Sequence, residues 1–315
     1  MEGYTGFGKG RHMSMRSTLV PRRTLRHNTV MPPVQSTDQT AALPPSPQPA
    51  RLAMGLAERT GRSLRFKLAE MLYAAGFIAQ VLRETVRFFN KRQTGYRVLV
   101  MQILFTGVEA LSIVSVLALA LGAVIIIQGY ALLPQFGQSK LVYTLLVFII
   151  TLELGPLLTA FIIIARSGTA IATEIAGMVV SHEVEAFMAF GINPLSFMVV
   201  PRFVGVMVAM IVLNIYFSVM GLLGSYLIAS FIAQIPFADY GKNLLSVLTA
   251  GDLAVSMVKA VVFGGIVSLV STYAGFSVNR ASTEIPQAGI KAVGKCFIWI
   301  IVADAMISLL YYLLQ

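Results

Sequence analysis

The sequence predicts an all-α polytopic membrane protein, and three features of the chain carry that prediction. Hydrophobic residues make up 57% of the chain and charged residues 12%, and the mean hydropathy is +0.78. These values are typical of proteins that cross a membrane several times. Five apolar segments approach or exceed the roughly 20 residues that a helix needs to cross the hydrocarbon core of a bilayer. An amphipathic segment precedes them, and a polar segment separates the second from the third.

The N-terminal tail, residues 1–55, is basic and rich in proline, and we expect it to be disordered. The chain has a net charge of +10, and residues 1–100 hold 16 of its 24 Lys and Arg but only 5 of its 14 Asp and Glu. A basic arm beside a membrane domain favours contact with an anionic membrane surface over contact with nucleic acid. Residues 1–50 contain no apolar segment of a secretory signal peptide, but their Arg-rich, acid-poor composition also allows an organellar targeting sequence.

Residues 56–100 predict an amphipathic helix that lies in the membrane interface. Apolar side chains recur there at three- and four-residue spacing. They are Leu64, Leu68, Leu72, Ala75, Ala79, Leu82, Val86 and Phe89. The charged residues that fall largely outside this stripe are Arg65, Arg83, Glu84 and Arg87. A soluble helix would show the same pattern, but the membrane domain that follows directly favours a helix whose basic side chains face lipid phosphates.

The membrane domain, residues 101–315, contains the five predicted transmembrane helices. They cover approximately residues 107–133, 141–165, 203–232, 253–276 and 294–314. Basic residues near span ends favour the cytoplasmic side. A cytoplasmic N-terminus places Arg92, Arg97, Arg166, Arg202, Arg280, Lys291 and Lys295 inside, and Lys140 and Lys242 outside. We therefore expect the N-terminus in the cytoplasm and the C-terminus on the other side.

Ionisable side chains within the spans mark a candidate cavity, because such groups are costly in hydrocarbon and normally face a cavity or a partner. Glu153 lies deep in the second span, and Pro156, three residues later, is expected to bend that helix. Asp304 lies in the middle of the fifth span, and Lys259 in the fourth can pair with a carboxylate. The helix-breaking Pro156 beside Glu153 favours a cavity-lining role for that glutamate. Asp304 has no helix-breaking residue beside it, which favours a structural ion pair there.

The polar segment at residues 166–193 is cytoplasmic in this orientation and predicts two helices. Small residues separate Arg166 from Glu174, which lies eight residues later on roughly the same helix face, and they allow close packing. Glycine and a pre-proline residue in Gly191-Ile-Asn-Pro194 stop the second helix. That helix carries Glu183 and Glu185 beside apolar side chains, which predicts an amphipathic surface for a soluble partner.

Enzymatic and metal chemistry find little support in this chain. Residues 3–10 nearly match a phosphate-binding loop, but Gly10 stands where the pattern requires Ser or Thr, so any ATP dependence needs a partner. Ser167 and His182 lack an orienting carboxylate for a hydrolase. His182 is the only histidine outside the tail, which excludes a multi-histidine metal site. The single cysteine, Cys296, excludes an internal disulfide.

A specific set of residues and short motifs lies between residues 153 and 203. It consists of Glu153-Leu-Gly-Pro156, Ala165-Arg-Ser-Gly168, Thr173-Glu174, Glu183, Ala186, Gly191, Pro194 and Pro201-Arg202-Phe203. In these residues and their spacing the chain resembles the MlaE/YrbE family of ABC-transporter permeases. Similarity in hydropathy and layout extends over about residues 60–315. The resemblance implies a homodimer with an interfacial N-terminal helix, five spans per subunit and a cytoplasmic coupling helix that docks into an ABC ATPase.

The resemblance also implies partners, ligands and location. A separate ATPase would bind ATP and Mg²⁺, so this chain would hold no cofactor and no metal. A periplasmic MCE-domain protein, and a STAS-domain accessory protein, would complete the system. Phospholipid would pass between the inner and outer membranes. The expected location is a bacterial inner membrane, with an organelle envelope membrane as the alternative.

Two sets of residues follow from this resemblance. Glu153 would line a lipid cavity at the dimer interface, and the set of candidate cavity residues is Leu152, Glu153, Pro156 and Asp304. Some members carry a basic residue immediately before the cavity glutamate, where this chain has Leu152. The coupling residues are expected to be Arg166, Gly168, Glu174, His182, Glu183 and Glu185.

Three functions of different classes are considered. The leading hypothesis is the membrane subunit of an ATP-driven phospholipid transporter. The alternative is a proton-coupled secondary transporter in which Glu153 and Asp304 titrate, although no inverted repeat between the halves is visible. A membrane scaffold without transport is the third.

Overall fold

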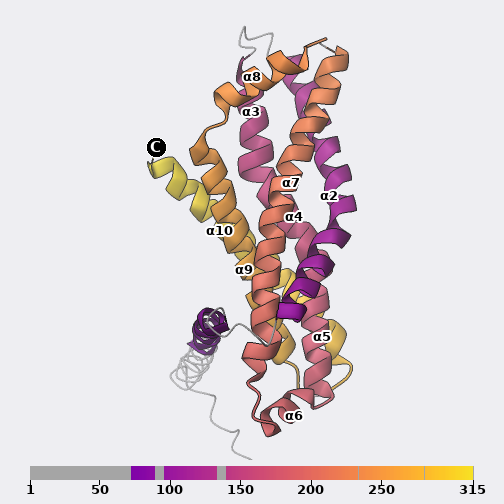
Figure 1. Cartoon of the computed structure of the whole chain (residues 1–315), viewed down its shortest axis with the longest axis vertical. Coiled ribbons are helices and arrows are strands. Elements are labelled where there is room, and N and C mark those ends of the chain that lie inside the picture. The colour runs from indigo at the N-terminus through magenta and orange to yellow at the C-terminus, as the bar shows by residue number, and fades with distance from the viewer. Residues whose placement is uncertain (1–71, 89–95, 133–139, 233, 280, 315) are drawn as a thin grey trace, which may run out of the picture. The chain divides into compact units, whose positions relative to one another are not determined.

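The computed structural model describes residues 72–88, 96–132, 140–232, 234–279 and 281–314, which all belong to the compact unit over residues 59–315 (Figure 1). All regular secondary structure in these residues is helical, which confirms the predicted all-α class. The predicted tail at residues 1–55 lies outside the described residues, as does the first part of the predicted amphipathic segment.

Within the described residues, five helical stretches are long and apolar enough to cross a membrane. They are Val98–Ala131, Leu141–Val180, Leu195–Ile232, Ala250–Phe276 and Glu284–Leu314. The chain is therefore a multi-pass membrane protein, and its described part contains the five helices that the sequence predicts.

Several spans combine α-helices with π-helical turns, whose hydrogen bonds skip one residue more than those of an α-helix. After a helix over residues 72–88 come α2 (Tyr96–Leu132), α3 (Lys140–Val147), η2 (Phe148–Leu154), α4 (Gly155–Ile163), η3 (Ile164–Gly168) and α5 (Thr169–Val180). They are followed by α6 (Glu183–Ala189), η4 (Leu195–Val199), α7 (Val200–Ile232), α8 (Phe237–Val247), α9 (Ala250–Phe276) and α10 (Glu284–Leu314). Figure 1 shows α5 and α6 at the opposite end of the bundle from α8.

Helical structure continues beyond residue 165, where the sequence predicts the end of the second span, and runs without a break through η3 and α5 to Val180. The predicted end lay just before the charged Arg166, but that guanidinium pairs with Glu109 of α2 and does not interrupt the helix. Gly168 is buried against α9 and continues the helix as well. One helical stretch therefore joins the middle of the bundle to α5.

α2 and α7 pack closely because glycines of each helix face the backbone of the other. A Cβ atom added at Gly122 would overlap the carbonyl oxygen of Gly221. One added at Gly224 would lie 2.5 Å from the carbonyl oxygen of Leu119. Small residues allow this approach, and in lipid it is van der Waals packing that holds such helices together.

The helix over residues 72–88 packs near the ends of α7 and α9. Phe77 makes an edge-on contact with Phe276 of α9, with 6.2 Å between ring centroids. Ser196 of η4 donates a hydrogen bond of 2.7 Å to Glu84 Oε2. This bond holds the pKa of the Glu84 carboxyl below its ordinary value. The apolar and polar contacts together anchor the described part of the predicted amphipathic segment.

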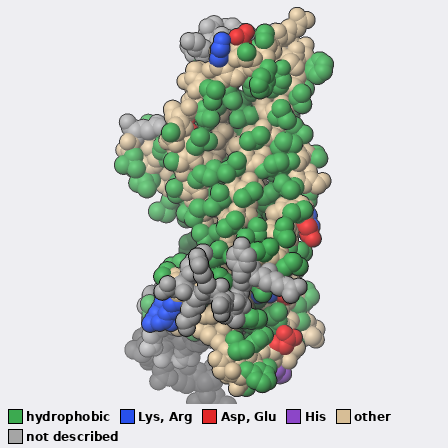
Figure 2. Space-filling view, in the orientation of Figure 1, with side chains coloured by type: hydrophobic (Ala, Val, Ile, Leu, Met, Phe, Trp, Pro, Cys, Tyr) green, Lys and Arg blue, Asp and Glu red, His purple; other side chains and the backbone are tan. Residues whose placement is uncertain are grey.

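Apolar side chains of that helix also face away from the bundle. Leu72, Leu82 and Val86 of the predicted stripe are exposed. The same is true of many large apolar residues on the spans, and Figure 2 shows hydrophobic side chains over most of the visible face between its two ends. A surface of this kind is suited to contact with lipid or with other membrane-embedded helices rather than with water.

The close approach of α2 and α7 predicts that Gly122→Ala lowers the thermal unfolding midpoint in detergent by several degrees. Overpacking of this kind costs about 1–3 kcal/mol, because the new methyl group meets backbone that cannot move aside. Gly107→Ala in the same helix is the matched control, since a Cβ there has nothing within 4 Å. Equal midpoints for the two variants would contradict the packing of α2 against α7.

Candidate functional site

Pro156 leaves one backbone carbonyl in the second span without its usual partner. An α-helical N–H bonds to the carbonyl four residues earlier, and proline has no N–H, so the carbonyl of Leu152 loses that bond. The π-helical turn η2 ends at Leu154, directly before α4 begins with Gly155 and Pro156. Lys259 of α9 donates from Nζ to the Leu152 carbonyl oxygen at 3.0 Å. The lysine therefore gives a side-chain donor to the carbonyl four residues before the proline.

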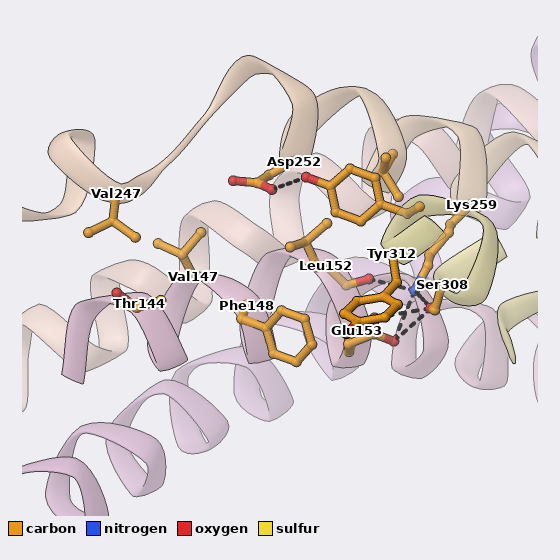
Figure 3. Close-up of a pocket in the computed structure, with 12 residues that line it drawn as sticks. Thr144, Val147, Phe148, Leu152, Glu153, Val247, Asp252, Lys259, Ser308 and Tyr312 are labelled. Atoms are coloured by element: carbon orange, nitrogen blue, oxygen red, sulfur yellow. Dashed lines mark hydrogen bonds and ion pairs between the residues drawn. The ribbon is translucent and has the colours of Figure 1, made fainter. Parts of the chain in front are cut away.

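Lys259 is also the centre of a charged cluster that joins three spans. Its ammonium lies 2.9 Å from Glu153 Oε2 of η2 and 2.8 Å from Asp304 Oδ1 of α10. It donates to Ser308 Oγ at 2.8 Å, and Ser308 in turn donates to Glu153 Oε1 at 3.1 Å. We call Glu153, Lys259, Asp304 and Ser308 the Lys259 cluster, and Figure 3 shows the contacts of the ammonium with Leu152, Glu153 and Ser308.

The Lys259 cluster is largely shielded from the surroundings. The lysine side chain is fully buried, whereas Glu153 is 27% exposed and Asp304 14% exposed. A buried ammonium without acceptors would cost several kcal/mol, and here two carboxylates compensate it. With both carboxylates ionised the cluster has a formal charge of −1. Asp304 pairs with the lysine, while Glu153 pairs with it and stays partly accessible.

A cavity of about 320 Å³ opens beside the Lys259 cluster. The residues that line it are Thr144, Val147, Phe148, Leu152, Glu153, Val247, Asp252, Val255, Lys259, Ser308, Tyr311 and Tyr312. Of the four cavity residues predicted from the sequence, Leu152 and Glu153 are part of this lining. Pro156 is buried within the bundle and is not among the lining residues, and neither is Asp304.

A second carboxylate, Asp252, lines the cavity near the start of α9. Tyr311 of α10 donates its hydroxyl to Asp252 Oδ1 at 2.8 Å. Asp252 Oδ2 accepts from the Thr249 N–H at 3.0 Å, and Thr249 Oγ1 accepts from the Asp252 N–H at 3.2 Å. This reciprocal capping box fixes the carboxylate at the first turn of the helix. In Figure 3, Asp252 lies apart from the contacts around the ammonium of Lys259.

Two ion pairs tie η3 and α5 of the second span to neighbouring helices. Arg166 of η3 bonds to the carboxylate and to the backbone carbonyl of Glu109 in α2. Glu174 of α5 accepts from Arg202 Nη2 of α7 at 2.6 Å. Gly168 lies between them in the chain, and a Cβ added there would be only 3.2 Å from a side-chain oxygen of α9. Arg166 and Glu174 therefore bind different helices, and Gly168 lies inside the bundle.

A tight turn at His182 joins α5 to α6. His182 has a left-handed backbone conformation with φ of 59° and precedes the first residue of α6, Glu183. Ser181 donates its hydroxyl to Glu183 Oε1 at 3.0 Å. His182 Nδ1 lies 3.5 Å from Glu185 Oε1, and both side chains are exposed. All three predicted coupling residues of this turn thus lie at one end of the bundle, on its surface.

Exposed apolar side chains stand beside those carboxylates. Gly191, with φ of 72°, ends α6 in a Schellman motif in which the Ile192 N–H donates to the Phe187 carbonyl at 2.9 Å. The side chain of Phe190 is 81% exposed and that of Met188 is exposed as well. We call α6 with its flanking residues 181–192 the α6 surface. Its mixture of carboxylates and large apolar groups is suited to a protein partner.

Sequence reasoning missed several partners of these residues. Ser308 follows Asp304 by four residues and so shares its helix face, a signal that points to the Lys259 cluster. Thr249-x-x-Asp252 has the spacing of a capping box. Glu109 carries the same signal as Glu153, a carboxylate within an apolar span. Among the described residues, no three His, Cys, Asp or Glu side chains lie together as a metal site requires.

Comparison with known proteins places this arrangement in context. A family model described as Permease MlaE matches residues 99–310, which include most of all five spans. A probable ABC transporter permease protein of Rickettsia typhi is 31% identical over 67% of this chain and 82% of that protein. The intermembrane phospholipid transport system permease protein MlaE of Haemophilus influenzae is 26% identical over 69% of this chain and 84% of its own length. The chloroplastic protein TRIGALACTOSYLDIACYLGLYCEROL 1 of Arabidopsis thaliana is 22% identical over 78% of this chain and 68% of its own.

The Lys259 cluster predicts a specific pattern of stabilities. Lys259→Met should destabilise the protein by about 3–5 kcal/mol, because two carboxylates and the Leu152 carbonyl lose their shared donor. The triple variant that adds Glu153→Gln and Asp304→Asn should regain a large part of this loss, since it removes the uncompensated charges. Thermal unfolding in detergent measures both. A triple variant no more stable than Lys259→Met alone would show that the ion pairs do not determine stability here.

Proposed function

The chain belongs to the MlaE permease family, and from that premise we propose that it is the membrane-spanning subunit of an ATP-driven ABC transporter of phospholipid. It is a transporter subunit rather than an enzyme, in keeping with the permease names of its relatives. Support for phospholipid as the substrate comes from the name of the Haemophilus influenzae relative. The cavity beside the Lys259 cluster supplies a polar site within apolar spans, as an amphipathic ligand requires.

The continuity of the second span is the observation that carries the proposed mechanism. Glu153, which lines the cavity, and α5, which ends at the α6 surface, lie on one unbroken helical stretch. A partner that displaces α6 can therefore move the helix that holds Glu153. The π-helical turns η2 and η3 lie on this route, and such turns are frequent where helices adjust at functional sites.

The α6 surface is the proposed docking site for the ATPase subunit. Its exposed apolar residues would enter a groove of the partner, and Glu183 and Glu185 would meet basic side chains at the rim. The ATPase would bind ATP and Mg²⁺.

We further propose a homodimer and an MCE-domain partner on the opposite face, with a STAS-domain protein as accessory. The N-terminus would lie in the cytoplasm of a bacterium and the chain in its inner membrane, with an organelle envelope as the alternative.

A proton-coupled secondary transporter is the second candidate, and one observation favours it. Glu153 and Asp304 share a single ammonium, so the Lys259 cluster holds one carboxylate more than its cation balances. Reconstituted vesicles separate the two functions. Lipid transfer that continues without any ATPase and stops when the proton gradient is collapsed would favour proton coupling. Transfer that requires the ATPase and ATP and ignores the gradient is the result we expect.

The proposed docking site predicts that Glu183→Lys reduces ATP-dependent lipid transfer by the reconstituted complex roughly tenfold or more, because the reversed charge would face basic residues of the partner. Gly168→Leu should also uncouple transfer, because a larger side chain does not fit between η3 and α9. Co-purification of the ATPase, its ATP hydrolysis and the transfer of labelled lipid are the measurements.

The matched control is Asp239→Lys in α8, an exposed acidic residue at the other end of the bundle. It should leave ATPase binding unchanged. Wild-type hydrolysis and transfer in both the Glu183 and the Gly168 variants would refute the assignment of α6 as the coupling element.

A further inference from the structure

The ammonium of Lys259 has no donor left for a ligand. An ammonium has three N–H donors, and four oxygen acceptors already lie within 3.0 Å of Nζ. They are the Leu152 carbonyl oxygen, Glu153 Oε2, Ser308 Oγ and Asp304 Oδ1. The side chain is also fully buried. Among the described residues that line the cavity, Lys259 is the one cation. Its N–H groups already donate to acceptors of the protein.

The carboxylates that line the cavity, unlike the Lys259 ammonium, keep capacity to accept further hydrogen bonds. A carboxylate offers about four lone-pair positions. Glu153 remains 27% exposed after its bonds to Lys259 and Ser308. Asp252 Oδ1 accepts a single bond from Tyr311. The charged groups in the described lining are thus two carboxylates and one saturated ammonium, a formal charge of −1.

Helix geometry separates the two carboxylates within the cavity. Asp252 and Lys259 are seven residues apart on α9, about two turns or 10 Å along one face. Ser308 and Tyr311, which bond to the two carboxylates, are one turn apart on α10. A ligand in the cavity therefore meets two separate acceptors, and apolar side chains such as Phe148 and Val255 belong to the same lining.

We propose that this cavity receives the cationic amine of a lipid headgroup, as in a phosphatidylethanolamine, and rejects a headgroup that ends in a bare phosphate, as in a phosphatidic acid. The inference rests on the proposed lipid transport and names the class of substrate within it. An ammonium donates charge-assisted hydrogen bonds to carboxylates, which are roughly twice as strong as neutral ones. A terminal phosphate would place its own acceptors and negative charge against Glu153 and Asp252.

The size of the cavity suits a headgroup rather than a whole lipid. About 320 Å³ lies at the small end of the range for ligand pockets, which is roughly 300–1,000 Å³. Acyl chains would extend from it along the exposed apolar surface of the spans, where Tyr312 and Leu309 of α10 are exposed. The cavity would discriminate between lipids by their headgroups. The acyl chains would contribute affinity that is the same for every headgroup.

A competition experiment tests the inference. Purified full-length chain in mild detergent is incubated with equal amounts of dioleoyl phosphatidylethanolamine and dioleoyl phosphatidic acid, and the retained lipid is measured by mass spectrometry. We expect the wild type to retain the ethanolamine lipid about tenfold over phosphatidic acid, the effect of one good charged hydrogen bond. Asp252→Asn and Glu153→Gln should each reduce this ratio to about threefold or less, since each replaces a carboxylate by a neutral amide.

Asp239→Asn is the matched control, because it removes the same charge from an exposed site outside the cavity. Its ratio should equal that of the wild type. Asp252→Asn keeps the test valid if Glu153→Gln disturbs the Lys259 cluster, since Asp252 has no contact with Lys259 among the bonds that hold it.

The outcomes separate this inference from the proposed function. Retention of neither lipid by the wild type would count against phospholipid transport itself. Retention without preference, or with preference for phosphatidic acid, would overturn the headgroup inference and leave phospholipid transport in place. A wild-type preference that persists in both cavity variants would locate selectivity outside this cavity and would also overturn the inference.

Discussion

A single buried ammonium, that of Lys259, holds the centre of this bundle together. It joins the second span to α10 through Glu153 and Asp304, and it donates to the Leu152 carbonyl oxygen, four residues before Pro156. A proline and a carboxylate within a membrane span are each costly by themselves. Here one lysine binds beside both, so the proline, the ion pairs and the cavity depend on one another.

The second span connects this centre to the end of the bundle that carries α5 and α6. Because helical structure runs without interruption from η2 to α5, the cavity wall and the α6 surface belong to one element. Arg166 and Glu174 attach that element to α2 and to α7, at points between the cavity and the turn at His182. In the proposed mechanism these ion pairs would guide a movement of α5 relative to its neighbours.

The polar and apolar parts of the surface have different uses in this arrangement. Glycines such as Gly122 and Gly224 let the spans pack backbone to backbone, which leaves large apolar side chains pointing outward. Polar side chains also pair within the bundle, as Asn214 of α7 does with Ser256 of α9. Within the cavity the charged groups with bonding capacity left are carboxylates, a property that the net charge of the whole chain conceals, since the basic excess lies in the first 100 residues.

The sequence by itself determined the number and order of the spans, because twenty consecutive apolar residues are a local property. It also pointed to Glu153 and to the helix end at Gly191, where a breaker or a left-handed residue acts on its immediate neighbours. Only the tertiary structure decided which side chains form ion pairs with one another. Glu153 and Lys259 are 106 residues apart, and Glu174 bonds to Arg202 rather than to any residue of its own helix. Which ionisable group meets which depends on how the helices pack, and hydropathy along the chain carries no record of that packing.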